Sequence, residues 1–564
     1  MKYVATLKNH LSVLRIAILL AMLALVAACA QVQPPKAPLF PSADFALSVL
    51  HTNDTHSMFG GTTDKGFACY AAMCDGGRGG YVRLDQAVRA IRKDNPNALF
   101  LEAGDIFQGT LFWTLHKERV PSALVDKMGY QAIIPGNHEF DDGWPTWLRY
   151  VDALKTQVLA ANVSFDPRPD SPAVDKVQPF TVIERDGRKI GVIGLVTETT
   201  PETSSPGSGV RFNDVQECLE DAVAKLTAQD VHIIIALVHL GLENEKRLAR
   251  TVDGVDIFVG GHSHSLLSNT DSRAEGPYPV VEKTPNGTPV LLVTASTGCA
   301  YLGKLDVGFD KQGVVTEWQG SPIILDQATL DSMDAPKPDT ELVQLINDFA
   351  TPVAEMMATI VGTINAEGRD GLPLEEPNVL ECRRVECLSG NVVADALRVV
   401  PFPEAQITIL NGGALRASLP GGAVTPGNVL GTLPFQNTPV MAKMPGSILL
   451  QALEHGVSAY GEGEGGFFQV SGLRYAFNPS NKPGKRITNV DVMNQKGQWR
   501  ALNPKETYMV VTLDFIAKGG DGYAMFKPLE WREGDKLMSD VLRVYMEQHS
   551  PVNASIQGRI TVQK

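Results

Sequence analysis

The residues of this chain that are able to do chemistry stand in five short motifs, each directly after an apolar run. One of them, residues 135–141, reads Pro-Gly-Asn-His-Glu-Phe-Asp and follows the apolar residues 132–134. It presents an amide, an imidazole and a carboxylate. A buried strand that ends this way delivers such groups to one edge of its sheet, where ligands of α/β folds bind. Taken alone, the motif is also compatible with an ordinary polar turn.

Two further motifs lie earlier in the chain. Residues 47–56 end in Asp54 and His56, and side chains two positions apart share one face of an extended chain. Residues 98–105 read as a buried strand that ends in a Gly-Asp turn at Asp105. An aspartate in this position suits a metal site, and it equally suits the cap of a helix.

The remaining two motifs end in histidine. Residues 233–239 are apolar until His239, and residues 257–264 run from a strand into Gly-Gly-His-Ser-His, with His262 and His264 two positions apart. A single histidine after an apolar run is more often a core residue than a ligand. Five motifs of this kind in one chain favour a metal centre.

The side chains at the five strand ends form a donor set for two divalent ions. The set comprises Asp54, His56, Asp105, Asn137, His239, His262 and His264. Nitrogen and oxygen donors in this number, with one carboxylate shared, suit two ions about 3.5–4 Å apart that clamp a phosphoryl group and make hydroxide available. His138 and Asp141 are left over, and they suit a second layer in which a carboxylate orients an imidazole.

Composition bounds the remaining possibilities. The chain has 564 residues, which predicts two or more domains, and its formal net charge is −13. This charge argues against a nucleic acid polymer as partner. An anionic small substrate stays compatible, because metal ions and arginines reverse the local sign inside a cleft.

The pattern of apolar residues changes along the chain. Residues 45–325 alternate strand-like runs with amphipathic helices, whereas residues 361–564 show short β-type runs between turns and predict an α+β domain. Residues 326–360 carry a helical apolar stripe, interrupted at Pro352, that predicts a connecting helix.

The first residues form a targeting segment. A basic start and a short apolar core predict a signal peptide over residues 1–28. Residues 26–29 resemble the bacterial lipobox, which predicts lipidation at Cys29 and a tether over residues 29–44. The alternative is plain secretion with cleavage after Ala30. Both readings export the protein, and the lipid would be its membrane contact.

Six cysteines remain after Cys29, an even number for an oxidising compartment. Two pairs are each separated by four residues and are expected to close small loops: Cys69 with Cys74, and Cys382 with Cys387. Cys218 and Cys299 are either a third pair or free thiols.

The five motifs, in this order, resemble the calcineurin-like metallophosphoesterases. The likeness continues into the second domain, so the chain resembles the 5′-nucleotidase family over essentially its whole mature length. This resemblance implies a four-layer α/β/β/α domain that carries two metals, followed by an α+β nucleotide-binding domain. It implies one metal surrounded by Asp54, His56, Asp105 and His264, and a second surrounded by Asp105, Asn137, His239 and His262. It further implies that His138 and Asp141 are the catalytic dyad.

The resemblance also implies a substrate pocket in the second domain. Its residues are Arg383 in the Cys-Arg-Arg-Val-Glu-Cys loop, Asn411, Gly413 and Arg416 of an Asn-Gly-Gly-x-x-Arg element, Phe435, Phe515 and Asp521. The arginines would orient the phosphate, the phenylalanines would hold the base, and the aspartate would bind ribose. Without the resemblance, these residues read as surface arginines, a turn and core phenylalanines.

The expected function is metal-dependent hydrolysis of nucleoside 5′-monophosphates such as AMP in the cell envelope, with an interdomain rotation between open and closed forms. His264 stands where such nucleotidases commonly carry an amide, so zinc is expected beside manganese as a candidate. The alternatives are UDP-sugar hydrolysis, 2′,3′-cyclic phosphodiesterase with 3′-nucleotidase activity, and, less favoured, a thiosulfohydrolase or a binding lipoprotein without activity.

Overall fold

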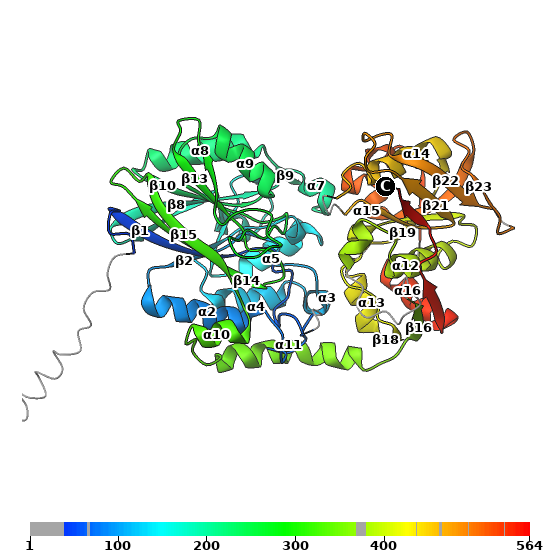
Figure 1. Ribbon diagram of the computed structural model, residues 1–564, viewed down its shortest axis with the longest axis horizontal. Coiled ribbons are helices and arrows are strands. Elements are labelled where there is room, and N and C mark those ends of the chain that lie inside the picture. The colour runs from blue at the N-terminus through cyan, green and yellow to red at the C-terminus, as the bar shows by residue number, and fades with distance from the viewer. Residues whose placement is uncertain are drawn as a thin grey trace, which may run out of the picture.

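The computed structural model describes residues 39–64, 68–367, 379–435, 437–461, 465–494, 496–534 and 536–563. The predicted signal peptide, Cys29 and most of the predicted tether lie outside these residues. Within them, no helix is both long enough and apolar enough to cross a membrane. Figure 1 shows a domain of blue to green elements beside a second domain of yellow to red elements.

Two stacked sheets form the centre of the first domain. The seven-stranded sheet has the order β15 (Val315–Ile324), β14 (Tyr301–Phe309), β1 (Phe45–Thr52), β2 (Leu99–Glu102), β3 (Ala132–Ile133), β4 (Gln157–Leu159) and β6 (Val177–Gln178). The six-stranded sheet has the order β12 (Val280–Lys283), β13 (Pro289–Val293), β11 (Ile257–Val259), β10 (Ile233–His239), β8 (Arg188–Val196) and β7 (Phe180–Arg185). A small ribbon pairs β5 (Val163–Phe165) with β9 (Val210–Phe212).

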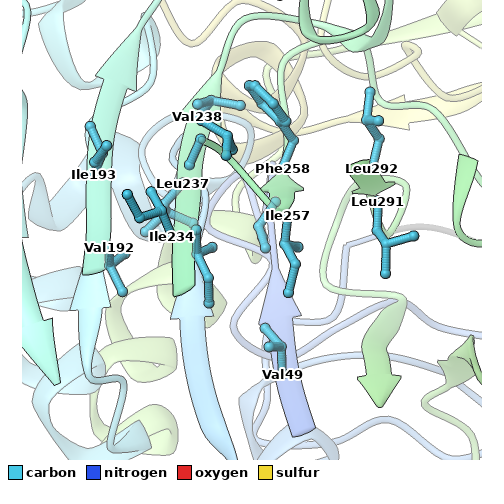
Figure 2. Close-up of a cluster of buried hydrophobic side chains, with 14 of the residues drawn as sticks. Val49, Val192, Ile193, Ile234, Leu237, Val238, Ile257, Phe258, Leu291 and Leu292 are labelled. Carbon is cyan, nitrogen blue, oxygen red and sulfur yellow. The ribbon is translucent and has the colours of Figure 1, made fainter. Parts of the chain in front are cut away.

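Helices cover the outer face of each sheet and complete four layers. The helices of this domain are α2 (Tyr81–Asp94), α3 (Leu111–His116), α4 (Arg119–Met128), η1 (His138–Phe140), α5 (Trp144–Ala153), α6 (Ala173–Lys176), α7 (Thr200–Thr203), α8 (Val215–Thr227) and α9 (Leu242–Thr251). Alternation along β1 explains the layering, because Val49 faces the core between the sheets and Leu50 faces the core beneath α2. Figure 2 shows Val49 below Ile257, and both belong to one apolar cluster that includes Ile234.

Two helices connect the domains. They are α10 (Gln327–Ser332) and α11 (Thr340–Met357), and α11 runs beneath the first domain toward the second (Figure 1). The expected interruption at Pro352 is wrong, since α11 continues through it. Proline removes one backbone hydrogen bond, and the buried Ile346 and Val353 hold the helix on either side. Ile360, expected in the same apolar stripe, lies beyond the helix and is 62% exposed.

The second domain is a mixed α+β structure with three sheets. Their orders are β18 (Gly422–Val424), β16 (Gly362–Glu367), β26 (Val552–Ser555); β20 (Phe468–Ser471), β17 (Ile407–Asn411), β24 (Thr507–Leu513), β19 (Pro439–Pro445), β25 (Trp531–Glu533); and β23 (Trp499–Ala501), β22 (Ile487–Met493), β21 (Leu473–Phe477), β27 (Ile560–Val562). The helices are η2 (Val379–Arg383), α12 (Leu388–Val399), η3 (Gly412–Ala414), α13 (Pro426–Thr432), α14 (Gly446–Gly456), α15 (Asp514–Ala517), η4 (Gly520–Gly522), η5 (Ala524–Phe526) and α16 (Met538–His549). Helix α13 packs on α3 and α11, and α7 packs on η4, so the two domains touch at both ends of their interface.

Candidate dinuclear metal centre

The five motifs converge where the two sheets of the first domain end. Strands β1, β2 and β3 are parallel neighbours in one sheet, and β10 and β11 are parallel neighbours in the other. Their carboxyl ends therefore meet at a common edge, and the residues just beyond them face one another. The sequence predicted that the motifs meet at the edge of one sheet, whereas in the structure they come from the ends of two stacked sheets.

The backbone at this edge is unusual. Five of the seven candidate ligands have positive φ angles: Asp54 (48°), His56 (46°), Asp105 (58°), His262 (82°) and His264 (56°). Such angles are uncommon outside glycine and cluster at functional sites, where the surrounding structure enforces them. The strands thus end in turns that bend each side chain toward the same centre.

Three of these side chains form a first group. Asp54, His56 and His264 place their potential ligand atoms within 4.8 Å of one another. The Nε2 atoms of His56 and His264 face each other at 3.0 Å, and Nε2 of His264 lies 3.4 Å from Oδ1 of Asp54. Two ring nitrogens and a carboxylate oxygen that point at one position are the donors that zinc prefers.

A second group consists of Asp105, His239 and His262, again within 4.8 Å. Nε2 of His239 lies 3.2 Å from Oδ2 of Asp105. The amide oxygen of Asn137 lies 2.9 Å from Nδ1 of His262 and so belongs to the same group.

Asp105 lies between the two groups. Its Oδ2 atom is 3.2 Å from Nε2 of His239 in the second group and 3.8 Å from Nε2 of His56 in the first. Its Oδ1 atom accepts the backbone N–H of His138. A carboxylate in this position could be shared by two metal ions.

The turn that carries Asp105 also orients two of the imidazoles. Nδ1 of His239 donates to the carbonyl oxygen of Ala103 at 2.7 Å, and Nδ1 of His56 faces the carbonyl oxygen of Phe107 at 3.3 Å. With Nδ1 as the donor, Nε2 keeps its lone pair for a metal. Among the described residues, the buried Nε2 of His239 has no hydrogen-bond partner of good geometry. This atom is therefore available to a metal ion.

The electrostatics of the site call for positive charge. Asp54 is fully buried, and burial, more than any neighbour, raises its pKa to about 7. Burial lowers the pKa of His239, but the Asp105 and Asp54 carboxylates outweigh it and raise that pKa to about 10. The carboxylates thus attract a positive charge to Nε2, which a divalent cation would supply in place of the proton. The donor set fits two divalent ions.

The other imidazoles are suited to bind metal because they are neutral. Burial is the main cause that lowers the pKa of His262 to about 4 and the pKa of His56 and His264 well below the usual range. The guanidinium of Arg416 adds to this effect at His56 and His264. A neutral imidazole keeps the lone pair that a metal ligand needs.

Two glycines allow the motifs to approach so closely. A Cβ atom on Gly136 would lie 2.2 Å from Oδ1 of Asp105, and one on Gly261 would lie 2.8 Å from Nδ1 of His239. Any side chain at these positions would push the turns apart.

Glu139 fixes two of the turns to each other, a role that the sequence did not indicate. Its buried carboxylate accepts the backbone N–H groups of Asp105, Ile106, Phe107 and Gly136. The feature that could have indicated this role is the place of Glu139 in a turn directly after a buried strand. A glutamate there has little access to water and must find hydrogen-bond donors within the protein.

The expected dyad is assembled beside the candidate ligands. Nδ1 of His138 donates to Oδ2 of Asp141 at 2.6 Å. Burial lowers the pKa of His138, but Asp141 and Asp105 outweigh it and raise that pKa above its ordinary value. The ring therefore carries a proton on both nitrogens more readily than a free histidine does.

Side chains of the second domain face this centre. The ring of Phe435 lies 6.0 Å from the ring of His138, and the guanidinium of Arg416 lies 5.8 Å from the Phe435 ring. Arg416 is close enough to act on Asp141, Asp105 and Asp54, and Arg383 acts on His264. Both arginines thus border the edge where the candidate ligands converge.

The remaining predicted pocket residues gather around η4. Asn411 donates from Nδ2 to Oδ2 of Asp521 at 2.8 Å, and Gly413 packs on the backbone of Gly465. The ring of Phe515 lies against Gly520. Among the described residues, Phe435 and Phe515 make no ring contact with each other, so any sandwich of the two requires a ligand between them.

The cysteines follow the expectation for the two short loops. Cys69 is bonded to Cys74, and Cys382 is bonded to Cys387. Cys218 and Cys299 are free thiols, which resolves the alternative that the sequence left open. The second disulfide closes the loop that carries Arg383.

Both domains match known protein families. Residues 47–266 match the model of the calcineurin-like phosphoesterases, and residues 360–528 match that of the 5′-nucleotidase C-terminal domain. The chain is 33% identical to the 5′-nucleotidase of Rattus norvegicus, over 93% of this chain and 92% of that protein. It is 32% identical to the snake venom 5′-nucleotidase of Naja atra, over 92% of this chain and 98% of that protein.

A solved structure shows the same architecture. The crystal structure of the 5′-nucleotidase precursor from Thermus thermophilus has a TM-score of 0.81 and 33% identity to this chain, over 92% of this chain and 100% of that one. The family model, the curated relatives and the solved structure agree over both domains. The chain therefore belongs to the 5′-nucleotidase family of metallophosphoesterases.

Proposed function

We propose that this protein hydrolyses nucleoside 5′-monophosphates, AMP among them, to nucleoside and phosphate. The observation that carries the proposal is the position of Asp105 between two groups of candidate ligands, with Phe435 and Arg416 of the other domain beside the neighbouring His138. Ligands for two ions, a cation for phosphate and an aromatic ring for a base meet in one place.

Two divalent ions would be held by the seven candidate ligands, with Asp105 shared. When bound, they supply positive charge for the phosphoryl group and a nucleophilic oxygen at neutral pH. The four imidazoles in the set favour zinc, and the carboxylate and amide oxygens keep manganese as the second candidate.

The side chains have distinct tasks in the reaction. Arg416 and Arg383 orient the phosphate, and the guanidinium fork suits two of its oxygens. His138, held at Nδ1 by Asp141, presents the N–H of Nε2 to the charge that develops on the phosphoryl and leaving oxygens. Phe435 and Phe515 hold the base, and Asp521 with Asn411 holds the ribose.

The proposed organisation follows the expected boundaries: a metal domain over 45–325, a connection over 326–360 and a substrate domain over 361–564. Because the ligands and the nucleoside pocket lie on different domains, the substrate domain rotates between open and closed forms. The contacts of α13 with α3 and of α7 with η4 belong to the closed form. A disulfide engineered between α3 and α13 should abolish turnover until it is reduced; full turnover in the oxidised protein contradicts the rotation.

The proposed location is the cell envelope, with export through the signal peptide and anchorage through lipidated Cys29. The two disulfides support an oxidising compartment.

Phosphate release from AMP, UDP-glucose and 2′,3′-cyclic AMP tests the function, on metal-reconstituted protein beside His138→Ala. Rapid release from AMP that collapses in the variant supports the proposal. Turnover of cyclic AMP or UDP-glucose alone overturns the substrate while keeping the metal centre. No metal-dependent turnover of any substrate indicates a binding protein.

A further inference from the structure

A buried hydroxyl completes the surroundings of the dyad. Ser204, which follows α7, is 5% exposed, and its Oγ donates to Oδ1 of Asp141 at 2.7 Å. The other oxygen of that carboxylate, Oδ2, is the one that accepts Nδ1 of His138. The three side chains therefore form a chain of hydrogen bonds that runs from the hydroxyl to the imidazole.

The segment that carries Ser204 is fixed at both ends. On one side, the backbone N–H of Thr197 donates to the carbonyl oxygen of His239. On the other side, the carbonyl oxygens of Pro206 and Ser208 accept the two N–H groups of Trp144 at the start of α5. The hydroxyl is thus held by two elements of the metal domain.

We propose that Ser204 is a positioning residue that sets the orientation of Asp141 and, through it, of His138. A carboxylate turns about a soft torsion, and one hydrogen bond leaves that turn partly free. A second bond on the other oxygen removes this freedom and keeps Oδ2 aimed at Nδ1. Ser204 would affect the reaction only through the orientation of Nε2 of His138. Its role therefore rests on the proposed function of that histidine.

The place of α7 adds to this role. Helix α7 packs against η4, which carries Asp521, at the boundary between the two domains (Figure 1). The segment that holds Ser204 is therefore also the part of the metal domain that contacts η4, the element that carries Asp521 of the proposed nucleoside pocket.

The test is a mutant cycle on metal-loaded protein. Ser204→Ala removes the donor and is expected to lower kcat about 10- to 100-fold, the range for one hydrogen bond to a charged group, with KM within about twofold. Ser204→Thr keeps a hydroxyl and should recover most of kcat. Ser205→Ala is the matched control, because Ser205 is the exposed neighbour and should behave as wild type.

The decisive comparison uses the His138→Ala background. If Ser204 acts through His138, adding Ser204→Ala to His138→Ala lowers kcat no further. An equal loss in both backgrounds, or a rise in KM with kcat unchanged, overturns the proposal. Should Ser204→Ala fail to fold or to bind metal, the same cycle with Ser204→Cys, a weak donor of similar size, decides the question.

The cycle is run on both AMP and p-nitrophenyl phosphate. The second substrate has a phosphate but no nucleoside, so its hydrolysis depends on the metal centre, the dyad and the phosphate-binding arginines, and not on the residues that hold the base and the ribose. Failure to hydrolyse AMP therefore counts against the proposed substrate, whereas additive losses on p-nitrophenyl phosphate count against Ser204.

Discussion

Glu139 offers a sharp test of how the metal centre is built. Its Oε2 atom accepts the N–H groups of Asp105 and Gly136, and its Oε1 atom accepts those of Ile106 and Phe107. Glu139→Gln keeps the shape of the side chain but replaces one oxygen with an NH₂ group. Two backbone donors then face another donor instead of an acceptor.

The expected loss follows from these contacts. Each hydrogen bond to a charged group contributes about 1.5–3 kcal/mol, so the loss of two predicts about 3–6 kcal/mol of local stability. Burial, followed by the Asp105 charge, raises the pKa of Glu139 to about 7. The experiment is therefore done about one pH unit above that value, where the carboxylate is ionised.

Hydrogen exchange at the four amides is the direct measurement. The predicted loss corresponds to exchange roughly 100- to 10,000-fold faster at Asp105, Ile106, Phe107 and Gly136, together with weaker metal retention. Glu341→Gln is the control, because Glu341 is exposed and pairs with Lys127 only at the surface, where a pair contributes less than about 1 kcal/mol. Wild-type exchange rates in Glu139→Gln would refute the reasoning.

Three further predictions concern pH, substrate binding and metal removal. Burial raises the pKa of Glu245 from 4.5 to about 8, so its contribution to stability is complete below about pH 4.5 and is lost as pH rises toward 8. Glu245→Gln should remove up to about 5 kcal/mol of this pH dependence, measured as unfolding midpoints at both ends of the range. Phe435→Ala should raise KM for AMP by about 5- to 150-fold through lost stacking and leave hydrolysis of ribose 5-phosphate unchanged; equal effects on both substrates contradict a base-binding role. Chelation should abolish turnover and lower the melting temperature, with about 2.7 kcal/mol returned when metal is restored at 100 times its Kd; an unchanged melting temperature contradicts the two-ion site.

The sequence predicted the parts of this molecule that depend on local pattern. Each strand that leads to a candidate ligand is a short apolar run, and the apolar stripe over residues 326–360 contains the predicted connecting helix α11. The two disulfides were predictable because each loop is short.

Contacts between distant segments could not be predicted in this way. The sequence shows strand ends but not that β1 and β10 belong to different sheets, since pairing depends on the whole domain. Ser204 and Asp141 are 63 residues apart, and nothing near either one marks their contact. The predicted interruption at Pro352 was wrong for a related reason, because tertiary packing along α11 outweighs the local preference of proline.

The pairing of β1 has a consequence for the order in which the chain matures. Strand β1 leads into Asp54, and its two neighbours are β2 and β14, the second of which begins only at Tyr301. A growing chain that has just passed His264 already holds every candidate ligand, yet one edge of β1 still lacks its partner. An open edge of this kind binds other chains readily. We therefore expect the metal centre to become complete only after β14 has paired with β1, because until then the strand that leads into Asp54 has one open edge.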